Sequence, residues 1–281
     1  MKLKIIGVSV CILLISTIAI PVASITDIHR SRATSYIVEV PIWEKGDEWT
    51  YIFTESSKDY PATYSISGNL KFKVMDDSGD SYILKATTRP RGAFDLGDFG
   101  LKTTLFTSLT MRLQIRKADF GLESCNYKLK GILLVTIGPF TLPIPLQIVA
   151  HYNVEFDPTW VIMPFPLFDG KFGNLSGTEF VHTNFFLHMF WGLIPFYGPE
   201  DISWPITSVP YICSEDQITV EANTFDVYNV SAEWMEGSRF VSYYSEEVGN
   251  VAKEIIYIPY HGGGGVRYSL TLELKDWSYT P

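Results

Sequence analysis

In the stretch LFTSLTMRLQIR, residues 105–116, apolar and polar side chains alternate strictly after Phe106 and Thr107. Apolar residues and Thr107 occupy its odd positions, whereas polar residues occupy its even positions from Ser108 onward. Successive side chains of a β-strand point to opposite faces, so the pattern predicts one long strand with a buried face and an exposed face. At about 3.3 Å per residue, that strand would be about 40 Å long.

The same alternation recurs along the chain. It occupies residues 266–275 near the C-terminus and, in shorter form, residues 70–74 and 82–87. Residues 76–80 and 235–239 have turn composition, which predicts two hairpins. No stretch of a dozen residues carries a convincing helical stripe. The best helix candidate is 199–211, which Pro205 interrupts.

These patterns predict a mainly β protein. Long consecutive strands that are apolar on one face fit a large coiled antiparallel sheet, either a half-barrel or an open barrel. Such a sheet must cover its concave face. Residues 131–199 are poor in charge and rich in proline and aromatic residues, so this middle segment is expected to provide the cover.

Residues 131–150, GILLVTIGPFTLPIPLQIVA, contain no charged residue. A membrane-spanning helix is disfavoured because Pro139, Pro143 and Pro145 would each break its backbone ladder. We expect instead a strand up to Thr136, a turn at 138–139 and a second strand over 146–156.

Residues 181–199, VHTNFFLHMFWGLIPFYGP, form a second uncharged block. Its glycine and proline punctuation suggests a long loop or lid. This segment would either fill the concave sheet as core, or gate a cavity for an apolar ligand or contact a membrane or partner. The candidate ligand-binding residues are Phe185, Phe186, Phe190, Trp191 and Phe196.

The N-terminus has the pattern of an export signal. Lys2 and Lys4 precede an apolar run, and small residues follow it near Ser24. We expect residues 1–24 to be a signal peptide or an uncleaved N-terminal anchor, 25–40 a polar spacer and 41–281 a single β domain. The protein is then extracytoplasmic, either secreted or attached to the cell surface, and an uncleaved N-terminus or the 181–199 segment would associate with the membrane.

Two cysteines remain after the expected signal. Cys125 and Cys213 would pair in an oxidising compartment, and the alternative is two separate buried thiols. Asn174 and Asn229 each begin a glycosylation sequon, so the exported chain is a candidate glycoprotein.

Composition and motifs narrow the chemistry. The formal net charge is −9, and the basic residues form no run beyond 30–32, which excludes an electrostatic footprint for nucleic acid. The histidines and cysteines lack metal-site spacing, and the glycine run 262–265 lacks the lysine and helix of a phosphate loop. No hydrolase motif occurs. We therefore expect a non-catalytic protein without metal or cofactor.

Two short elements resemble a known superfamily. Residues 43–51, WEKGDEWTY, and residues 243–253, YYSEEVGNVAK, are similar to elements near the two ends of proteins in the lipoprotein-localisation-factor superfamily and its uncharacterised relatives. Glu247 departs from the proline usual in the second element, and the uncharged middle has no counterpart. The resemblance implies a coiled antiparallel sheet with an apolar concave face, which in the carrier proteins accepts acyl chains.

The sequence thus predicts an exported, non-catalytic protein that binds an apolar or lipid-like ligand in the concave face of its sheet. The alternative is a structural or adhesion module of the cell envelope with a filled core and no ligand.

Overall fold

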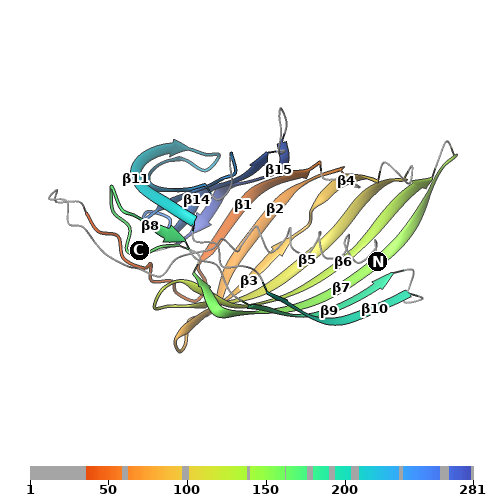
Figure 1. Cartoon of the computed structure of the whole chain (residues 1–281), viewed down its shortest axis with the longest axis horizontal. Helices are drawn as coiled ribbons and strands as arrows, with labels where there is room; N and C mark the ends of the chain where they lie inside the picture. Colours follow the sequence, from red (N-terminus) through yellow and green to blue (C-terminus); the bar gives the residue numbers. More distant parts are fainter. Residues whose placement is uncertain are drawn as a thin grey trace.

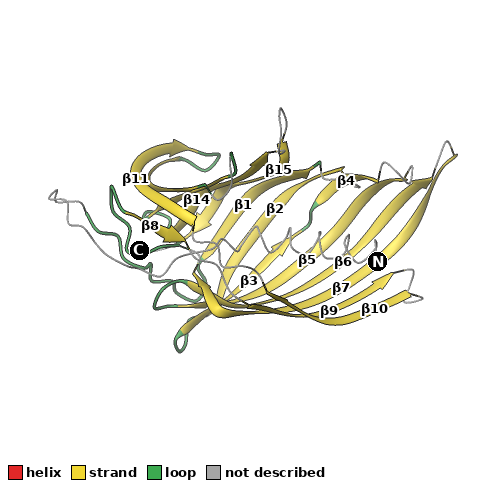
Figure 2. Ribbon diagram, in the orientation of Figure 1, coloured by secondary structure: helices red, strands yellow, loops and turns green. Residues whose placement is uncertain are grey.

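The computed structural model describes residues 36–58, 63–96, 101–137, 140–161, 163–175, 180–189, 194–203, 209–233, 237–259 and 266–279. These residues form strands and loops and no helix (Figure 2). The strands are β1 Glu48–Ser57, β2 Thr63–Asp76, β3 Ser81–Thr88, β4 Arg91–Leu96, β5 Leu101–Arg116, β6 Gly121–Ile137, β7 Phe140–Val161, β8 Phe172–Leu175, β9 Phe180–Met189, β10 Ile194–Ser203, β11 Val209–Thr219, β12 Thr224–Ala232, β13 Arg239–Ser245, β14 Asn250–Pro259 and β15 Val266–Ser278.

All fifteen strands belong to one antiparallel sheet. Its order is β10-β9-β7-β6-β5-β3-β2-β1-β15-β14-β13-β12-β11-β8, and β4 pairs with β2 and β5 beside this path. The sheet is open, with β10 and β8 at its two ends. In Figure 1, β8 and β11 lie at one end of the molecule, and the long strands β5, β6 and β7 extend away from that end. The mainly β fold and the large open antiparallel sheet are confirmed.

The alternating patterns explain the strands. In β5, Leu109, Met111, Leu113 and Ile115 are buried, and the polar residues between them are exposed. In β15, the apolar residues from Tyr268 to Leu274 are buried in the same way. β15 pairs with β1 on one side and β14 on the other, so the C-terminal strand joins the first strand to the antiparallel series from β14 to β11.

Both predicted hairpins are present. β2 ends at Asp76 and β3 begins at Ser81, and the Ser78 amide donates a 3.1 Å hydrogen bond to Asp76 Oδ1 within the turn. β12 and β13 pair antiparallel on either side of the second predicted turn. The best helix candidate, 199–211, is strand where the structure describes it, because β10 extends to Ser203 and β11 begins at Val209. Each of these strands has a neighbour with which its backbone can pair, whereas Pro205 would interrupt a helix.

The uncharged stretch 131–150 contains two strands, as predicted. β6 ends at Ile137, β7 begins at Phe140, and the two strands pair antiparallel. β7 accommodates Pro143 and Pro145 within its length. The middle of the chain therefore extends the sheet.

The loop or lid predicted over 181–199 is wrong, because the described part of this segment lies in the sheet. Residues 180–189 and 194–203 form β9 and β10, a hairpin that pairs with β7 and ends the sheet. Regular pairing satisfies the backbone polar groups of this uncharged segment, which an apolar loop lying over the sheet would leave without partners. Gly198 and Pro199, which suggest a loop, lie within β10.

A shorter part of the middle segment does contribute to the core. Met163, Phe165 and Leu167, which follow β7, are buried against the inner face of the sheet. Leu167 exchanges two backbone hydrogen bonds with Val38, at 2.8 and 2.7 Å. Residues near 165 therefore supply the cover that was predicted for the whole middle segment.

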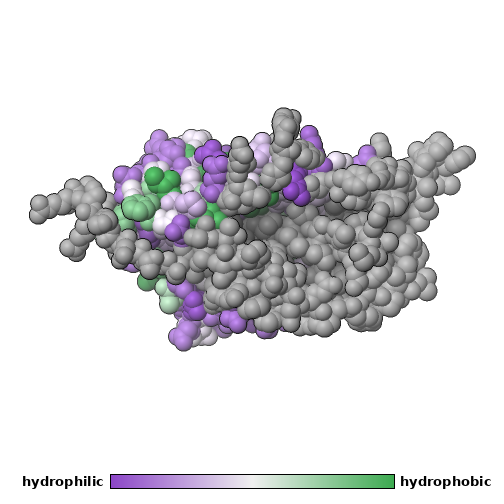
Figure 3. Space-filling view, in the orientation of Figure 1, coloured by the Kyte–Doolittle hydropathy of each residue, from purple (hydrophilic) through white to green (hydrophobic). Residues whose placement is uncertain are grey.

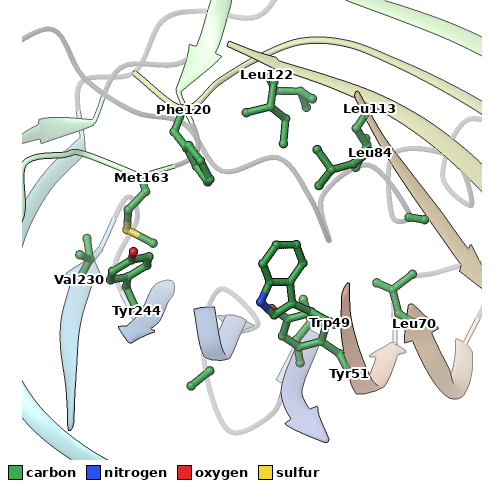
Figure 4. Close-up of a cluster of buried hydrophobic side chains, with 14 of the residues drawn as sticks. Trp49, Tyr51, Leu70, Leu84, Leu113, Phe120, Leu122, Met163, Val230 and Tyr244 are labelled. Atoms are coloured by element: carbon green, nitrogen blue, oxygen red, sulfur yellow. The ribbon is translucent and has the colours of Figure 1, made fainter. Parts of the chain in front are cut away.

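The core brings the two halves of the coiled sheet together. Figure 4 shows Trp49 directed into a cluster that includes Leu84 and Leu113 from the first half and Tyr244 from the second half. The ring of Phe165 lies 5.7 Å from that of Phe120 and 5.1 Å from that of Tyr244, between ring centroids. The concave side of the sheet is therefore packed with large side chains around Trp49 and Phe165.

Candidate ligand-binding site

The residues predicted to bind a ligand are only partly within the described chain. Phe185 and Phe186 lie in β9, and Phe196 lies in β10. In register, Phe185 pairs with Tyr152 and Phe186 pairs with His151. The side chains of these three residues, and the whole of Phe190 and Trp191, lie outside the described residues. Their role in binding stays a prediction.

The two sequons differ in exposure. Asn174 is exposed on the edge strand β8, whereas Asn229 is half-buried in β12 and its Oδ1 accepts a 2.7 Å hydrogen bond from Ser231 Oγ. Glycosylation of either residue stays a prediction. The expected signal and most of the spacer lie outside the described residues.

The predicted disulfide is wrong. Cys125 and Cys213 are both free and buried. Cys125 lies in β6 between Leu113 and Val154, and Cys213 pairs with Val230 in the other half of the sheet. β6 and β11 are not neighbours in the sheet, and neither cysteine is the register partner of the other.

We expect Cys125 and Cys213 to be unreactive in the folded protein and reactive once it is unfolded. Burial raises the pKa of Cys125 to about 12 and that of Cys213 to about 11, so both stay protonated thiols. Alkylation without reductant, followed by peptide mass spectrometry, checks this. Recovery of the two cysteine peptides linked to each other would contradict the structure.

The two elements that resemble the lipoprotein-localisation-factor superfamily contact each other. Trp43 Nε1 donates a 2.7 Å hydrogen bond to the Gly249 carbonyl, and Trp49 Nε1 donates one of 2.7 Å to the Val248 carbonyl. The Tyr51 hydroxyl donates one of 2.9 Å to the Val251 carbonyl. These bonds join positions about 200 residues apart in sequence. We call this set of contacts the aromatic clasp.

Gly249 is required in the clasp by geometry. Its φ is 60°, and a Cβ atom built on it would lie 2.3 Å from the ring of Tyr279. A side chain would strain the backbone and collide with that ring. The two elements are therefore explained by packing and backbone hydrogen bonding, and the clasp presents no reactive group.

A second set of inward-facing residues is polar. β1 buries Trp49, Tyr51, Phe53, Glu55 and Ser57 in alternation, so Glu55 points to the same side as the core aromatic residues. Its side chain is 1% exposed. Glu55 Oε1 accepts a 3.0 Å hydrogen bond from the Tyr64 hydroxyl, whereas Oε2 has no hydrogen-bond partner.

Glu254 occupies the matching position on β14. It lies between Ala252 and Ile256 on the buried face, it is 7% exposed, and its Oε1 has no hydrogen-bond partner. Ser242 of β13 pairs with Glu254 in register, is fully buried, and has an unpartnered Oγ.

The polar set continues across the sheet. Thr88 of β3 and Thr107 of β5 also face inward, are at least nine-tenths buried, and have Oγ1 atoms without partners. We call Ser242, Glu254, Glu55, Thr88 and Thr107 the polar belt. Buried polar atoms normally have hydrogen-bond partners, and an orphaned atom calls for an explanation such as a bound molecule.

Burial controls the charge of the two belt carboxyl groups. It raises the pKa of Glu55 to about 8, against the opposing effect of hydrogen bonds from Tyr64 and Tyr268. Burial also raises the pKa of Glu254 to about 8. Both groups are therefore mostly protonated near neutral pH and can donate as well as accept hydrogen bonds.

Basic residues of β2 and β14 form ion pairs on the outer face of the sheet. Lys253 Nζ lies 2.6 Å from Glu273 Oε1 across β14 and β15, and Lys71 and Lys73 pair with Glu48. Within the described part of the chain, no ion pair involves either belt carboxyl group. The belt is therefore a row of hydrogen-bonding groups on the apolar inner face, and its two carboxyl groups become negatively charged only when they lose their protons.

Lys171 is a buried charge with a different role. It is 9% exposed, and its Nζ donates hydrogen bonds of 2.5 and 2.7 Å to the carbonyls of Pro164 and Pro166. Its own carbonyl accepts a 2.7 Å bond from the Cys213 amide. Burial lowers the pKa of Lys171. These contacts fasten the covering segment to β11, so Lys171 is a structural residue.

The polar belt was not predicted, although its signal is present in the sequence. Once residues 49, 51 and 53 are assigned to a buried face, the period of two places Glu55 on that face too. The same reasoning from Ala252 and Ile256 places Glu254. A charged residue in an inward position is the exception that marks a candidate site.

Comparison with protein-family models, with curated proteins and with solved structures gave no match. In the described ranges, no helix is long and apolar enough to cross a membrane. The same ranges contain no group of three potential metal-binding side chains.

Proposed function

We propose that this chain is an exported, non-catalytic protein that binds an apolar or lipid-like ligand on the concave face of its sheet. The observation that carries the proposal is the polar belt. Five buried residues in five strands have side-chain atoms that lack a hydrogen-bond partner, on a face that is otherwise apolar. An amphiphile satisfies both parts of this surface, because its chain contacts the apolar residues and its polar end contacts the belt.

The apolar surroundings of the belt support this chemistry. The β15 residues between Glu55 and Glu254 are Leu270 and Leu272, and Phe53 is the next inward residue on β1. Ile66 pairs with Glu55 on the other side. A water-soluble polar ligand would gain little from such neighbours, whereas burial of each methylene group contributes about 0.8 kcal/mol. Export is part of the proposal because of the signal pattern in residues 1–24.

A structural or adhesion module is the second candidate function. Phe172 of β8 and Ile212 of β11 pair in register and are 66% and 56% exposed. Figure 3 shows a small hydrophobic group near β11 on an otherwise mainly hydrophilic set of described residues. An exposed apolar pair beside the edge strand β8 is compatible with a protein partner. This candidate requires no ligand on the inner face.

Native mass spectrometry distinguishes the two functions. We expect the protein, purified from cells without organic solvent, to carry a lipid-sized adduct that is lost on unfolding. After refolding without lipid, it should bind the neutral apolar fluorophore N-phenyl-naphthylamine, because the apolar face is then unoccupied. A clean apo mass together with no fluorophore binding would reject the ligand-binding proposal and leave the structural module.

A further inference from the structure

The two acids of the polar belt narrow the chemistry of the ligand. Glu55 and Glu254 lie on β1 and β14, the two strands that flank β15. Glu55 is in register with Leu270, and Glu254 is in register with Leu272, so the acids are offset by two residues. By ordinary strand spacings, their Cα atoms are about 12 Å apart. Two glutamate side chains directed toward each other, with one small group between them, can span that distance.

The unsatisfied atoms of the acids are acceptors when the acids are ionised. Glu55 Oε2 and Glu254 Oε1 lack partners, and the unpartnered Ser242 Oγ is on the residue in register with Glu254. A protonated amine offers three donors and one positive charge, which matches two carboxylates and a hydroxyl. An anionic head group would face two acids with no basic partner in the described residues, so its binding is disfavoured.

We propose that Glu55 and Glu254, with Ser242, form a subsite that takes a protonated amine at the polar end of an apolar ligand. This inference rests on the proposed function and specifies the ligand class of the same site. The amine replaces the missing basic partner of each carboxyl group. Binding then ionises groups that are mostly protonated in the free protein, and it releases protons to the solvent.

The groups that face the two acids do not supply a competing charge. The Tyr64 hydroxyl of β2 donates a hydrogen bond to Glu55, and the neutral Tyr268 of β15 lowers the pKa of Glu55. Tyr51 is close to Glu254, and its hydroxyl donates to a backbone carbonyl. Ser242 from β13 is neutral. The amine of a ligand would therefore be the only cation that these contacts assign to the subsite.

Three probes with the same chain test the head-group preference: octylamine, octanol and octanoate. Each is titrated by calorimetry into the full chain freed of bound lipid, near pH 7, below the concentration at which the probe aggregates. We expect octylamine to bind at least about tenfold more tightly than octanol, since charge-assisted hydrogen bonds are the stronger kind. Octanoate should bind most weakly. Only octylamine should release protons, seen as a dependence of the heat on buffer.

Matched variants assign the preference to the acids. Glu55→Gln and Glu254→Gln should each lower octylamine affinity toward that of octanol and reduce its proton release. Glu48→Gln and Glu273→Gln remove acids from the outer faces of β1 and β15, and both should leave octylamine binding unchanged. Circular dichroism and unfolding curves check that each variant folds. If an inner-face variant does not fold, the amine subsite is judged from the wild-type chain alone, by whether octylamine binding releases protons.

The outcomes separate the two proposals. If octanol binds as tightly as octylamine and neither releases protons, the amine subsite is wrong and the apolar ligand site stands. If octanoate binds most tightly, the amine subsite is wrong as well. If no probe binds to the refolded chain, the proposed function itself is wrong.

Discussion

Replacing Trp49 with alanine is expected to lower the free energy of unfolding by about 4–6 kcal/mol, the largest effect of any single substitution considered for this chain. Trp49 is fully buried, and its ring centroid lies 4.9 Å from that of Trp43. The substitution leaves a cavity at the centre of the core and removes the hydrogen bond to the buried Val248 carbonyl. Equilibrium unfolding in urea, followed by tryptophan fluorescence and circular dichroism, measures the change.

Two further variants divide this effect into its parts. Trp49→Phe keeps an aromatic ring and loses the indole donor, so we expect it to cost less than Trp49→Ala. Ile42→Ala is the control, because Ile42 is 76% exposed and adjoins Trp43. Its effect should stay within about 0.5 kcal/mol. If Trp49→Ala were as mild as Ile42→Ala, the aromatic clasp would not be the stabilising centre of the fold.

Raising the pH from about 6 to about 9 is expected to destabilise the ligand-free protein. The pKa of both Glu55 and Glu254 is about 8 in the folded state, against the usual 4.5. Between these values the folded chain binds more protons than the unfolded chain does, so stability falls as the pH rises through the folded pKa. Each carboxyl group contributes up to about 1.4 kcal/mol per pH unit.

Glutamine variants test the origin of this pH dependence. Glu55→Gln and Glu254→Gln keep a neutral side chain at every pH, so their melting temperatures should fall less between about pH 6 and pH 9. Each variant should be more stable than the wild type at the alkaline end.

Glu48→Gln is the matched control for the pH experiment. Hydrogen bonds from Lys71 and Lys73 lower the pKa of Glu48, so this group is ionised throughout the range. Its replacement should shift the melting temperature by a similar amount at every pH. An unchanged pH slope in Glu55→Gln and Glu254→Gln would show that these two carboxyl groups do not control the alkaline loss of stability.

The strands and turns follow from local chemistry. The alternation over 105–116 and 266–275 predicts β5 and β15 because one face of each strand must avoid water. Asp76–Gly79 composition predicts the β2–β3 turn because these residues accept tight backbone geometry, and Gly79 adopts a φ of 77°. The strand boundary predicted near Pro139 agrees with β6, which ends at Ile137, and with β7, which begins at Phe140.

The place of the 181–199 segment could not be predicted from its composition. Aromatic residues with glycine and proline punctuation are equally suited to a covering loop and to a two-stranded hairpin. Pairing with β7 decides in favour of the hairpin. The disulfide prediction failed for a related reason, since an even cysteine count does not place Cys125 and Cys213 on neighbouring strands.

The sequence by itself determined the β class and the alternation of buried and exposed residues in strands such as β5 and β15, because the side-chain period of a strand is local and fixed at two. Only the tertiary structure decided which strands are neighbours. That order depends on backbone pairing between segments more than about 200 residues apart, such as β1 and β15. It joined residues 43–51 to 243–253 in the clasp, placed Glu55 and Glu254 on the strands flanking β15, and thereby created the polar belt.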